Sequence, residues 1–342
     1  IQPPGTESPE DDYWYAAWHR FHGKTWFQLP WYFAEAFFYR RILEATGYFG
    51  SENEAVNRWR GIDPFLPQKL KELASDNLWQ VLDIALQRSD DNTDSSFWAM
   101  MHHCVWGNRI DLSYNKVAEE TGRAITVDQE QQNLLVDDTS AVLGHIHRFV
   151  IQNTGSRRQI AFICDNSGTE LLLDLALADY FLCFGWVNQV TLHSKIHPFF
   201  VSDATPADIE TAIEAINATI NLPLVTELGS RLTRYRETAQ LNIQSDNFWN
   251  SDRFFWDMPK ELSENLSEAE LVVIKGDANY RRLLGDSRWP TTVPITKLTR
   301  YFPAPFVALR TMKSDPVVGL SPGQAEALDN EDPLWRVNGK RG

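Results

Sequence analysis

The stretch "QIAFICDNSGTELLLDLALADYFL", residues 159–182, decides the fold class. It opens on an unbroken apolar run, turns at "DNSG" and continues as a long apolar segment of helix formers. A short apolar run followed at once by a helix is typical of a buried parallel strand and its crossover helix. The stretch also raises a question of function, because Asp165 and Asn166 stand where the strand ends.

Short apolar runs alternate with helical patterns through the rest of this half of the chain. Strands that alternate with helices indicate parallel strands joined by crossover connections. We therefore expect an α/β fold with a doubly wound, mainly parallel sheet and flanking helices. The expected strands are 160–164, 189–194, 197–202, 271–275 and 305–310, and the expected helices carry "ELLLDLALADYFL", "PADIETAIEAINATI" and "ANYRRLLG".

The first half of the chain has helix formers with broad apolar faces instead. Expected helices lie at 31–45, 67–89, 95–113 and 134–153. A chain of 342 residues exceeds the length at which one hydrophobic core usually stops growing. We predict three parts, which are a disordered tail (1–12), a mainly helical N-terminal domain (13–153) and an α/β domain (154–342) that ends in an extended, wrapping tail.

The composition limits the class of partner. A net charge of −14 argues against a nucleic-acid backbone, although a metal ion and a few local cations suffice for a small phosphorylated ligand. Three cysteines without a C-x-x-C pair predict no disulfide framework and favour a reducing cytosol. The longest apolar stretch, 171–187, contains two aspartates, and the N-terminus has no secretory pattern. We expect a cytoplasmic protein without a membrane or nucleic-acid partner; protein partners are left open.

Polar and charged residues follow four of the expected strands. Asp165 to Gly168 follow the first, Asp203 follows 197–202, Gly276 to Tyr280 follow 271–275, and Arg310 to Lys313 follow the last. Ligands of an open parallel sheet bind in the crevice outside the carboxyl ends of its strands. These residues are therefore the candidates for one shared site.

Helix capping is the alternative explanation at each position. Thr169, Thr205 and Asp277 each stand where a side chain would cap the helix that follows. Capping gives no reason for Asn166 beside Asp165, or for Lys313. We therefore favour a common site, with capping compatible at some positions.

The residue types at these strand ends suit a metal ion and a phosphate. Asp165, Asn166 and Asp203 are hard oxygen donors of the kind that Mg²⁺, Mn²⁺ or Co²⁺ prefers. The segment "KGDANYR" places backbone N–H groups at a helix start, where they favour an anion, and Arg310 and Lys313 add positive charge. Such a set fits phosphoryl transfer or phosphate-ester hydrolysis. The sequence has no G-x-G-x-x-G, P-loop or G-x-S-x-G motif.

With these residues identified, the chain resembles the damage-control phosphatase family, whose eukaryotic members are also called acidic-residue methyltransferases. The matching blocks run in the family's order from about Thr25 to about Gly339. They are "WYFAEAFFYRR", "VWGNRIDLS", "DNSGTELLLDLALADYFL", "HPFFVSD", "KGDANYRRLLGD" and the "RTMK" at 310–313. Larger relatives carry an extra helical segment before "TWFQLPWYF", and little of it precedes that block here.

The resemblance implies a helical domain beside an α/β domain, with a divalent metal (Mn, Co, Ni or Mg) at their junction. It implies that Asp165, Asn166 and Asp203 bind the metal. It also implies that Asp277 to Arg281 and Lys313, of the R-T-x-K motif, contact a phosphorylated substrate. Family substrates are small phosphometabolites such as sugar phosphates, including damaged or misplaced ones.

We therefore expect a metal-dependent phosphatase that acts on a fructose phosphate-like sugar phosphate. Asp165, Asp203 and Lys313 are the expected catalytic residues, and a direct attack by Asp165 stays open as an alternative to an activated water. The expected substrate-binding residues are Asn108, Asp111, Glu170, Asp277, Asn279, Tyr280, Arg281, Arg310 and Lys313.

Two other functions are weighed against this one. The first is carboxyl methyl transfer from S-adenosylmethionine, which is disfavoured because no Gly-rich loop follows the first strand of the α/β half. The second is a non-catalytic phosphometabolite-binding protein, which the combination of metal donors and Lys313 disfavours.

Overall fold

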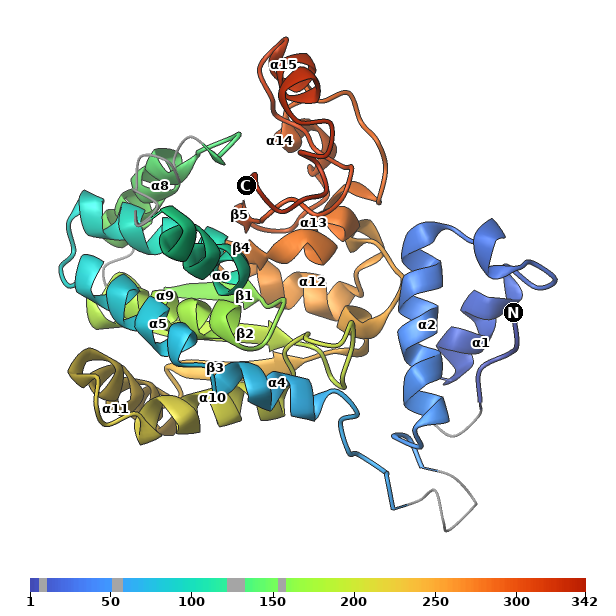
Figure 1. The fold of residues 1–342 in the computed structure, drawn as a ribbon, viewed down its shortest axis with the longest axis horizontal. Helices are drawn as coiled ribbons and strands as arrows, with labels where there is room; N and C mark the ends of the chain where they lie inside the picture. Colours follow the sequence, from blue (N-terminus) through green and yellow to red (C-terminus); the bar gives the residue numbers. More distant parts are fainter. Residues whose placement is uncertain (6–10, 51–57, 122–132, 153–157) are drawn as a thin grey trace.

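The computed structural model describes residues 1–5, 11–50, 58–121, 133–152 and 158–342, with the side chains of 11 and 108–121 left out. Its centre is a five-stranded sheet in the order β3-β2-β1-β4-β5 (Figure 1). All four neighbouring pairs are parallel, with Ile160 opposite Val190 on one side and Leu271 on the other. The strands are β1 (Gln159–Ile163), β2 (Gln189–Ser194), β3 (Leu241–Ser245), β4 (Leu271–Lys275) and β5 (Phe306–Leu309). The expected α/β class is confirmed.

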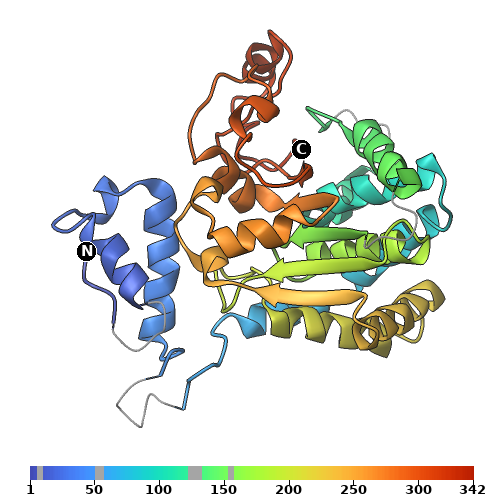
Figure 2. The same ribbon diagram turned by 180° about the vertical axis from the view of Figure 1, so that it is seen from behind.

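Helices cover both faces of the sheet, so the central strands are buried throughout (Figures 1 and 2). One face packs against α9 (Thr169–Cys183), α10 (Pro206–Ala218) and α11 (Pro223–Glu237), together with helices from the first half of the chain. The other face packs against α12 (Lys260–Ser267), α13 (Gly276–Leu284) and two short 3-10 turns, Asn247–Asn250 and Phe255–Asp257. Alternate residues of β1 supply the two cores, because successive side chains point to opposite faces.

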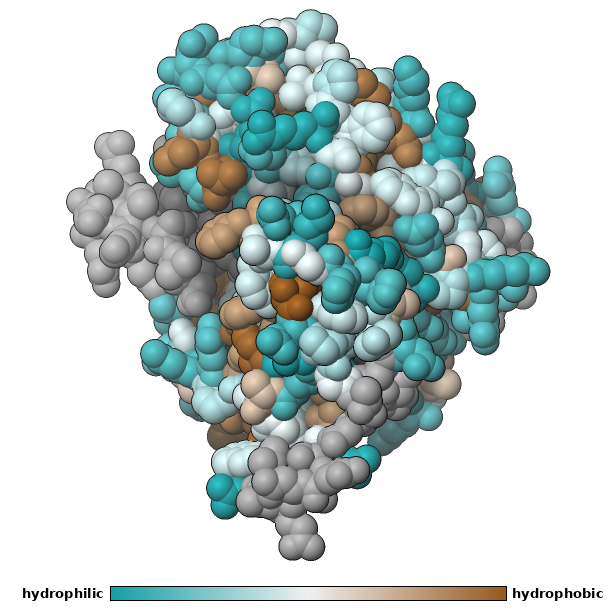
Figure 3. Space-filling view, turned by 90° about the vertical axis from the view of Figure 1, so that its right-hand side faces the viewer, coloured by the Kyte–Doolittle hydropathy of each residue, from teal (hydrophilic) through white to brown (hydrophobic). Residues whose placement is uncertain are grey.

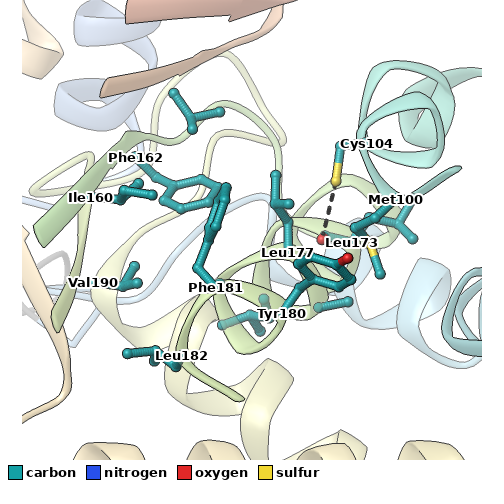
Figure 4. Packing of buried hydrophobic residues seen from close by; sticks show 14 of the residues in the cluster. Met100, Cys104, Ile160, Phe162, Leu173, Leu177, Tyr180, Phe181, Leu182 and Val190 are labelled. Carbon is teal, nitrogen blue, oxygen red and sulfur yellow. Dashed lines mark hydrogen bonds between the residues drawn. The ribbon is translucent and has the colours of Figure 1, made fainter. Parts of the chain in front are cut away.

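Helix α9 is the centre of the larger core. Every residue from Thr169 to Leu182 is buried, which explains why the helix is apolar on nearly all sides. Figure 4 shows Phe181 beside Ile160 and Phe162 of β1, and the Cys104 thiol donating to the Leu173 carbonyl at 3.3 Å. Helices α5 and α6 pack on α9 from the far side. The opening stretch of the sequence is thus the strand and helix around which the core forms.

The helices of the first half divide between two cores. Helices α5 (Asp76–Arg88), α6 (Asp94–Thr121) and α8 (Thr139–Gln152) share the main core with the sheet. Helices α1 (Asp11–His19) and α2 (Trp31–Ala45) form an aromatic core of their own, joined by Phe199. Short elements complete the chain, namely a 3-10 turn Trp26–Gln28, α4 (Leu66–Leu73), α14 (Ile295–Leu298) and α15 (Gln324–Glu331). A domain boundary at residue 153 stays a prediction.

Several expected boundaries in the helical regions are wrong. The helix expected at 67–89 is broken at Ser75 into α4 and α5, and the helix expected from 134 begins at Thr139. Within the expected disordered tail, the Ile1 amino group donates to the Lys24 carbonyl at 2.8 Å and α1 begins at Asp11, while three of residues 1–5 are exposed. The expected extended tail after Lys313 contains the helix α15.

One expected strand, 197–202, is absent, and one strand, β3, was missed. Phe200 and Val201 have φ values of 44° and 67°, which are incompatible with a strand, while Phe199 is buried in the core of α1 and α2. The apolar run therefore forms a loop, which Phe199 anchors to α1 and α2. Strand β3, "LNIQS", lies at the sheet edge with partly exposed residues, so it lacks the continuous apolar run of a central strand.

The cysteines and the described helices bear on disulfide bonding and on membrane crossing. Cys104, Cys164 and Cys183 are all free thiols. None of the described helices combines the length and the apolar character that crossing a bilayer requires.

The buried His193 predicts a specific pH dependence of stability. Burial lowers its pKa from 6.5 to about 4, so between these values the unfolded chain binds a proton that the folded chain does not. Stability therefore rises with pH in this window, and acidification from pH 7 to 5 costs about 2 kcal/mol through this group. Urea unfolding at both pH values should show a smaller acid loss in His193→Gln than in the wild type. Equal losses in the two proteins would contradict the assignment.

Candidate functional site

Two loops meet at the carboxyl end of the sheet and bring the predicted metal donors together. Asn166, just after β1, pairs with Asp203 in an isolated antiparallel bridge. The Ala204 amide donates to the Asp165 carbonyl at 2.8 Å, and the Ser167 amide donates to the Ser202 carbonyl at 2.7 Å. The backbone thus fixes Asp165, Asn166 and Asp203 side by side, although Asp203 lies on a loop and not after the strand expected at 197–202.

The loop that carries Asp203 holds a strained backbone. Phe200 and Val201 are non-glycine residues with left-handed φ, and for the β-branched Val201 this conformation is rare. The strain is offset by the burial of Phe199 in the aromatic core of α1 and α2 and by ring contacts from Phe200 to Tyr39. Strain of this kind persists where the surroundings enforce it, and it collects at functional sites.

The donor cluster is electrostatically unusual. Asp165 and Asp203 are buried, and the pKa of each is raised above its usual value, by burial first and then, for Asp165, by the charges of Glu170 and Asp203. The Asn166 amide nitrogen donates to Asp165 Oδ2 at 2.8 Å and to Glu170 Oε2 at 2.9 Å. Asp165 Oδ1 has no hydrogen-bond partner among the described residues. Buried polar atoms almost always have a hydrogen-bond partner, so this unpaired carboxylate oxygen calls for an explanation.

Two lysines that the sequence analysis missed support Asp203. Lys195 Nζ lies 3.2 Å from Asp203 Oδ2, and Lys69 Nζ donates to the Asp203 carbonyl at 3.1 Å. Both lysines are buried, and Lys69 also pairs with Asp208 at 2.7 Å. Lys195 directly follows β2, so its position at a strand end is a sequence signal that could have identified it. Lys69 in α4 has no comparable local signal.

A second buried pair lies behind the donors. Lys275, at the end of β4, contacts Asp174 Oδ1 at 2.8 Å and Glu170 Oε1 at 3.5 Å. Burial raises the pKa of Asp174 to about 7, although Lys275 acts in the opposite direction. Burial also disfavours the charged form of Lys275 and so acts to lower its pKa. The neighbouring Asp174 and Glu170 carboxylates nevertheless raise that pKa above its usual value. Lys275 therefore places a positive charge on the far side of Glu170, which in turn faces Asn166.

The capping alternatives have different outcomes at the three positions. Thr205 caps α10 in a capping box with Asp208, as expected. Thr169 does not cap α9; instead Glu72 of α4 accepts from the Thr169 amide at 2.9 Å and so caps the helix from outside. Asp277 does not cap α13, because the helix begins at Gly276 and Asp277 lies inside its first turn, where it is bonded to Arg310.

A cavity of about 590 Å³ opens onto the donors from between α2 and the strand ends. Trp31 and Glu35 of α2 therefore form one wall of the cavity. The charged, amide and aromatic side chains that line it include Trp31, Glu35, Asp165, Asn166, Asp203, Asp277, Arg281, Asp286, Arg288, Lys313 and Asp315.

Of the predicted substrate-binding residues, Asp277, Arg281 and Lys313 line this cavity. Asp277 Oδ1 accepts from Arg310 Nε at 2.6 Å and from the Lys313 amide at 3.2 Å, so it holds the R-T-x-K segment in place. Lys313 is exposed, and its charge lowers the pKa of Asp165, against the larger raising effects of burial and the neighbouring acids.

The other predicted residues whose side chains the structure describes do not line the cavity. Asn279 is fully buried and donates to the Cys164 carbonyl at 3.1 Å, which ties the ends of β1 and β4 together. Arg310 stacks over Tyr280 at 4.1 Å and donates to the Pro316 carbonyl at 2.6 Å. Glu170 is buried behind Asn166. The predicted Asn108 and Asp111 fall within α6, and their side chains lie outside the described residues.

The donor atoms of Asp165, Asn166 and Asp203 are of the type that a hard divalent ion prefers. In the part of the chain that the structure describes, no three His, Cys, Asp or Glu side chains are placed to hold a metal by themselves. The set here combines two carboxylates, Asp165 and Asp203, with the amide of Asn166. Asn166 Oδ1 now accepts from Ser202 at 2.6 Å, and a half-turn of the amide exchanges its oxygen and nitrogen. The unpartnered Asp165 Oδ1 is the observation that fits a cation at this position.

Comparison with known proteins gives the family. The model of the damage-control phosphatase ARMT1-like domain matches residues 8–328. Damage-control phosphatase ARMT1 of Danio rerio is 32% identical over 338 residues, covering 92% of this chain and 73% of that protein. The human protein of that name is 30% identical over 338 residues, covering 94% and 75%. A crystal structure of a DUF89-family protein from Pyrococcus horikoshii matches with 17% identity and a TM-score of 0.42, covering 83% of this chain and 94% of that one.

The family model and the curated relatives place the chain in the damage-control phosphatase class. The chain belongs to the ARMT1-like damage-control phosphatase family. The resemblance drawn from the sequence blocks is confirmed.

Gly276 predicts a direct test of how Asp165 is positioned. Its φ is +79°, and a side chain there would overlap the Asp165 carboxylate, whereas Gly185, with φ +68°, has open space. Gly276→Ala and Gly185→Ala should each lose about 1 kcal/mol of unfolding free energy to the left-handed backbone. Only Gly276→Ala should also lose phosphatase activity, by about ten-fold or more, because Asp165 must turn away. Equal activity in the two variants would contradict this positioning role.

Proposed function

We propose that the protein is a metal-dependent phosphatase that hydrolyses small phosphomonoesters, above all sugar phosphates, in the control of damaged or misplaced metabolites. The observation that carries the proposal is the convergence, on one cavity, of two buried carboxylates, an amide and Lys313. Such a set neutralises phosphoryl oxygens while it holds the reacting groups in place. The names of the curated relatives support the phosphatase part of the proposal.

Asp165, Asn166 and Asp203 are the residues that would hold the metal. A bound Mg²⁺, Mn²⁺, Co²⁺ or Ni²⁺ ion would supply Lewis-acid stabilisation of the phosphoryl oxygens. Lys195 and Lys69 keep Asp203 in position through its side chain and its carbonyl, and Lys275 does the same for Glu170. These buried cations offset part of the repulsion among the carboxylates, which lets several acids occupy one strand end.

Lys313 and the start of α13 would bind the phosphate itself. Lys313 is exposed in the cavity, within electrostatic range of Asp165. Asp277 and Ala278 in the first turn of α13 line the same space, where backbone N–H groups favour an anion. The Asp277 carboxylate repels that anion less than a free carboxylate would, because Arg310 forms an ion pair with it.

Asp165 has two chemical roles open to it. Its Oδ1 is free of hydrogen bonds among the described residues, so this atom is available to a metal or for attack on phosphorus. In the first role the attacking group is a water molecule, and Asp165 positions the phosphoryl group. In the second, Oδ1 attacks phosphorus while the P–O bond to the alcohol breaks, and the alcohol oxygen takes a proton and leaves. Water then attacks the phosphorus of the aspartyl-phosphate, which releases inorganic phosphate and restores the Asp165 carboxylate. Either role requires the carboxylate to be ionised, and a bound cation favours that form.

The proposal predicts phosphate release that depends on both the metal and two named residues. Release from a panel of sugar phosphates and nucleotides should occur with Mn²⁺, Co²⁺, Ni²⁺ or Mg²⁺ and cease in EDTA. Asp165→Asn removes a charged ligand and Lys313→Met removes the phosphate cation, so each should lower kcat/KM by about a hundred-fold or more.

A matched control is Lys260→Met, because the Lys260 side chain is 89% exposed and lies on α12, away from the cavity. It should keep wild-type activity. Release that persists in EDTA, or full activity in Asp165→Asn, would overturn the metal-dependent mechanism. Binding of sugar phosphates without any release would instead favour the non-catalytic alternative.

A further inference from the structure

We infer that the first turns of α2 recognise the sugar part of the substrate, with Trp31 packing on the face of the carbohydrate and Glu35 accepting hydrogen bonds from its hydroxyl groups. The inference rests on the proposed function, and it names the residues that would separate a sugar phosphate from other phosphate esters. Trp31 and Glu35 both line the cavity and stand four residues apart on one helix, so their side chains share a face.

Trp31 places a large aromatic side chain, 71% exposed, at the edge of a polar cavity. Hydrophobic residues on the face that carries α1 and α2 lie scattered among hydrophilic ones rather than in one broad patch (Figure 3). An aromatic face beside polar groups is suited to the apolar C–H face of a sugar ring, whose hydroxyls point outward to the neighbours.

Glu35 is held in a fixed position for such a contact. Its Oε2 pairs with Arg281 Nη1 at 2.9 Å, and the side chain keeps 35% exposure. Arg281 is itself buried, stacks over Tyr32 at 5.0 Å and pairs with Asp286 at 2.8 and 3.1 Å. Asp286, which lines the cavity too, has a left-handed φ of 49° that this pairing helps to maintain. A carboxylate fixed in advance loses little entropy when it accepts a hydroxyl.

The charges of the cavity match a neutral polyol that carries one phosphate. Arg281 is paired with Glu35 and Asp286, and Arg288 is paired with Asp315. Among the described cavity residues, Lys313 is the one cation without an ion-pair partner. One free cation beside a metal site suits a single phosphate group, while the carboxylates on the far wall would repel a second one. Nucleoside diphosphates and triphosphates fit this charge pattern poorly.

The size of the cavity agrees with this ligand class. A volume of about 590 Å³ lies within the range of sites that enclose small organic ligands and exceeds what a lone phosphate ion needs. The remaining space is bounded by Trp31, Glu35 and Asp286. The geometry thus assigns phosphate binding to the strand ends and sugar binding to α2 and the Arg281 ion pairs.

The test compares the binding of a hexose monophosphate, supplied as its non-hydrolysable phosphonate analogue, with that of inorganic phosphate, measured by calorimetry on the metal-loaded protein. The wild type should bind the hexose phosphate about ten-fold more tightly or better. Trp31→Ala and Glu35→Gln should each remove most of this preference, while the affinity for inorganic phosphate changes by less than about two-fold. Trp31→Phe should retain much of the preference, because the aromatic face remains.

The matched control is Phe27→Ala, since Phe27 is a fully exposed aromatic residue that does not line the cavity. It should leave both affinities unchanged. Equal binding of the two ligands by the wild type, or an unaltered preference in both Trp31→Ala and Glu35→Gln, would overturn the inference. A variant that loses both ligands equally would also count against it, because that result marks a structural role.

Kinetics separates this inference from the function on which it rests. The ratio of kcat/KM for the hexose phosphate to that for a small aryl phosphate should fall about ten-fold in Trp31→Ala, mainly through KM. If the wild type releases no phosphate but still prefers the hexose phosphate in binding, the phosphatase proposal fails and the sugar site stands. If it hydrolyses both esters and the ratio is unchanged in Trp31→Ala, the sugar site alone is wrong.

Discussion

The packing of the Asp165 carboxylate against the backbone of Gly276 is the contact on which the site depends. It joins the ends of β1 and β4, and only a glycine leaves the room for it. Asn279 strengthens the junction by donating to the carbonyls of Cys164 and Lys275 at 3.1 and 2.9 Å. A carboxylate that is buried in this way needs compensating charge, because desolvation alone would neutralise it. Much of the surrounding structure can be understood as that compensation.

Buried cations supply it from several directions. Lys195 follows β2, Lys275 ends β4, and Lys69 reaches the site from α4. Removing one partner of a buried ion pair costs far more than a surface pair is worth, so the acids and lysines depend on one another. The group still leaves Asp165 Oδ1 without a partner among the described residues. That unpaired oxygen is the atom on which the proposed metal site rests.

The N-terminal helices are part of the site rather than an appendage. Helix α4 caps α9 through Glu72 and fixes the Asp203 loop through Lys69. Helices α1 and α2 bury Phe199, which holds the left-handed backbone of Phe200 and Val201. Helix α2 also supplies the wall opposite the strand ends. The helical half therefore shapes the loop that presents Asp203 and closes the cavity that the sheet alone would leave open.

The sequence by itself determined the parts that local patterns encode. The apolar run and helix of residues 159–182 gave the parallel sheet, and the rule that ligands bind at strand ends selected Asp165, Asn166 and Lys313. Thr205 was recognisable as a cap because the capping box spans four residues. The family blocks extended this to the activity of the family.

Only the tertiary structure decided which distant residues complete the site. Glu35 meets Arg281 across 246 positions, and Glu72 meets Thr169 across 97. The run 197–202 has the composition of a strand, but the aromatic core of α1 and α2 captures Phe199 and turns it into a loop. Local propensity cannot reveal such outcomes, because the free energy that selects them comes from contacts between segments that meet only in the folded chain.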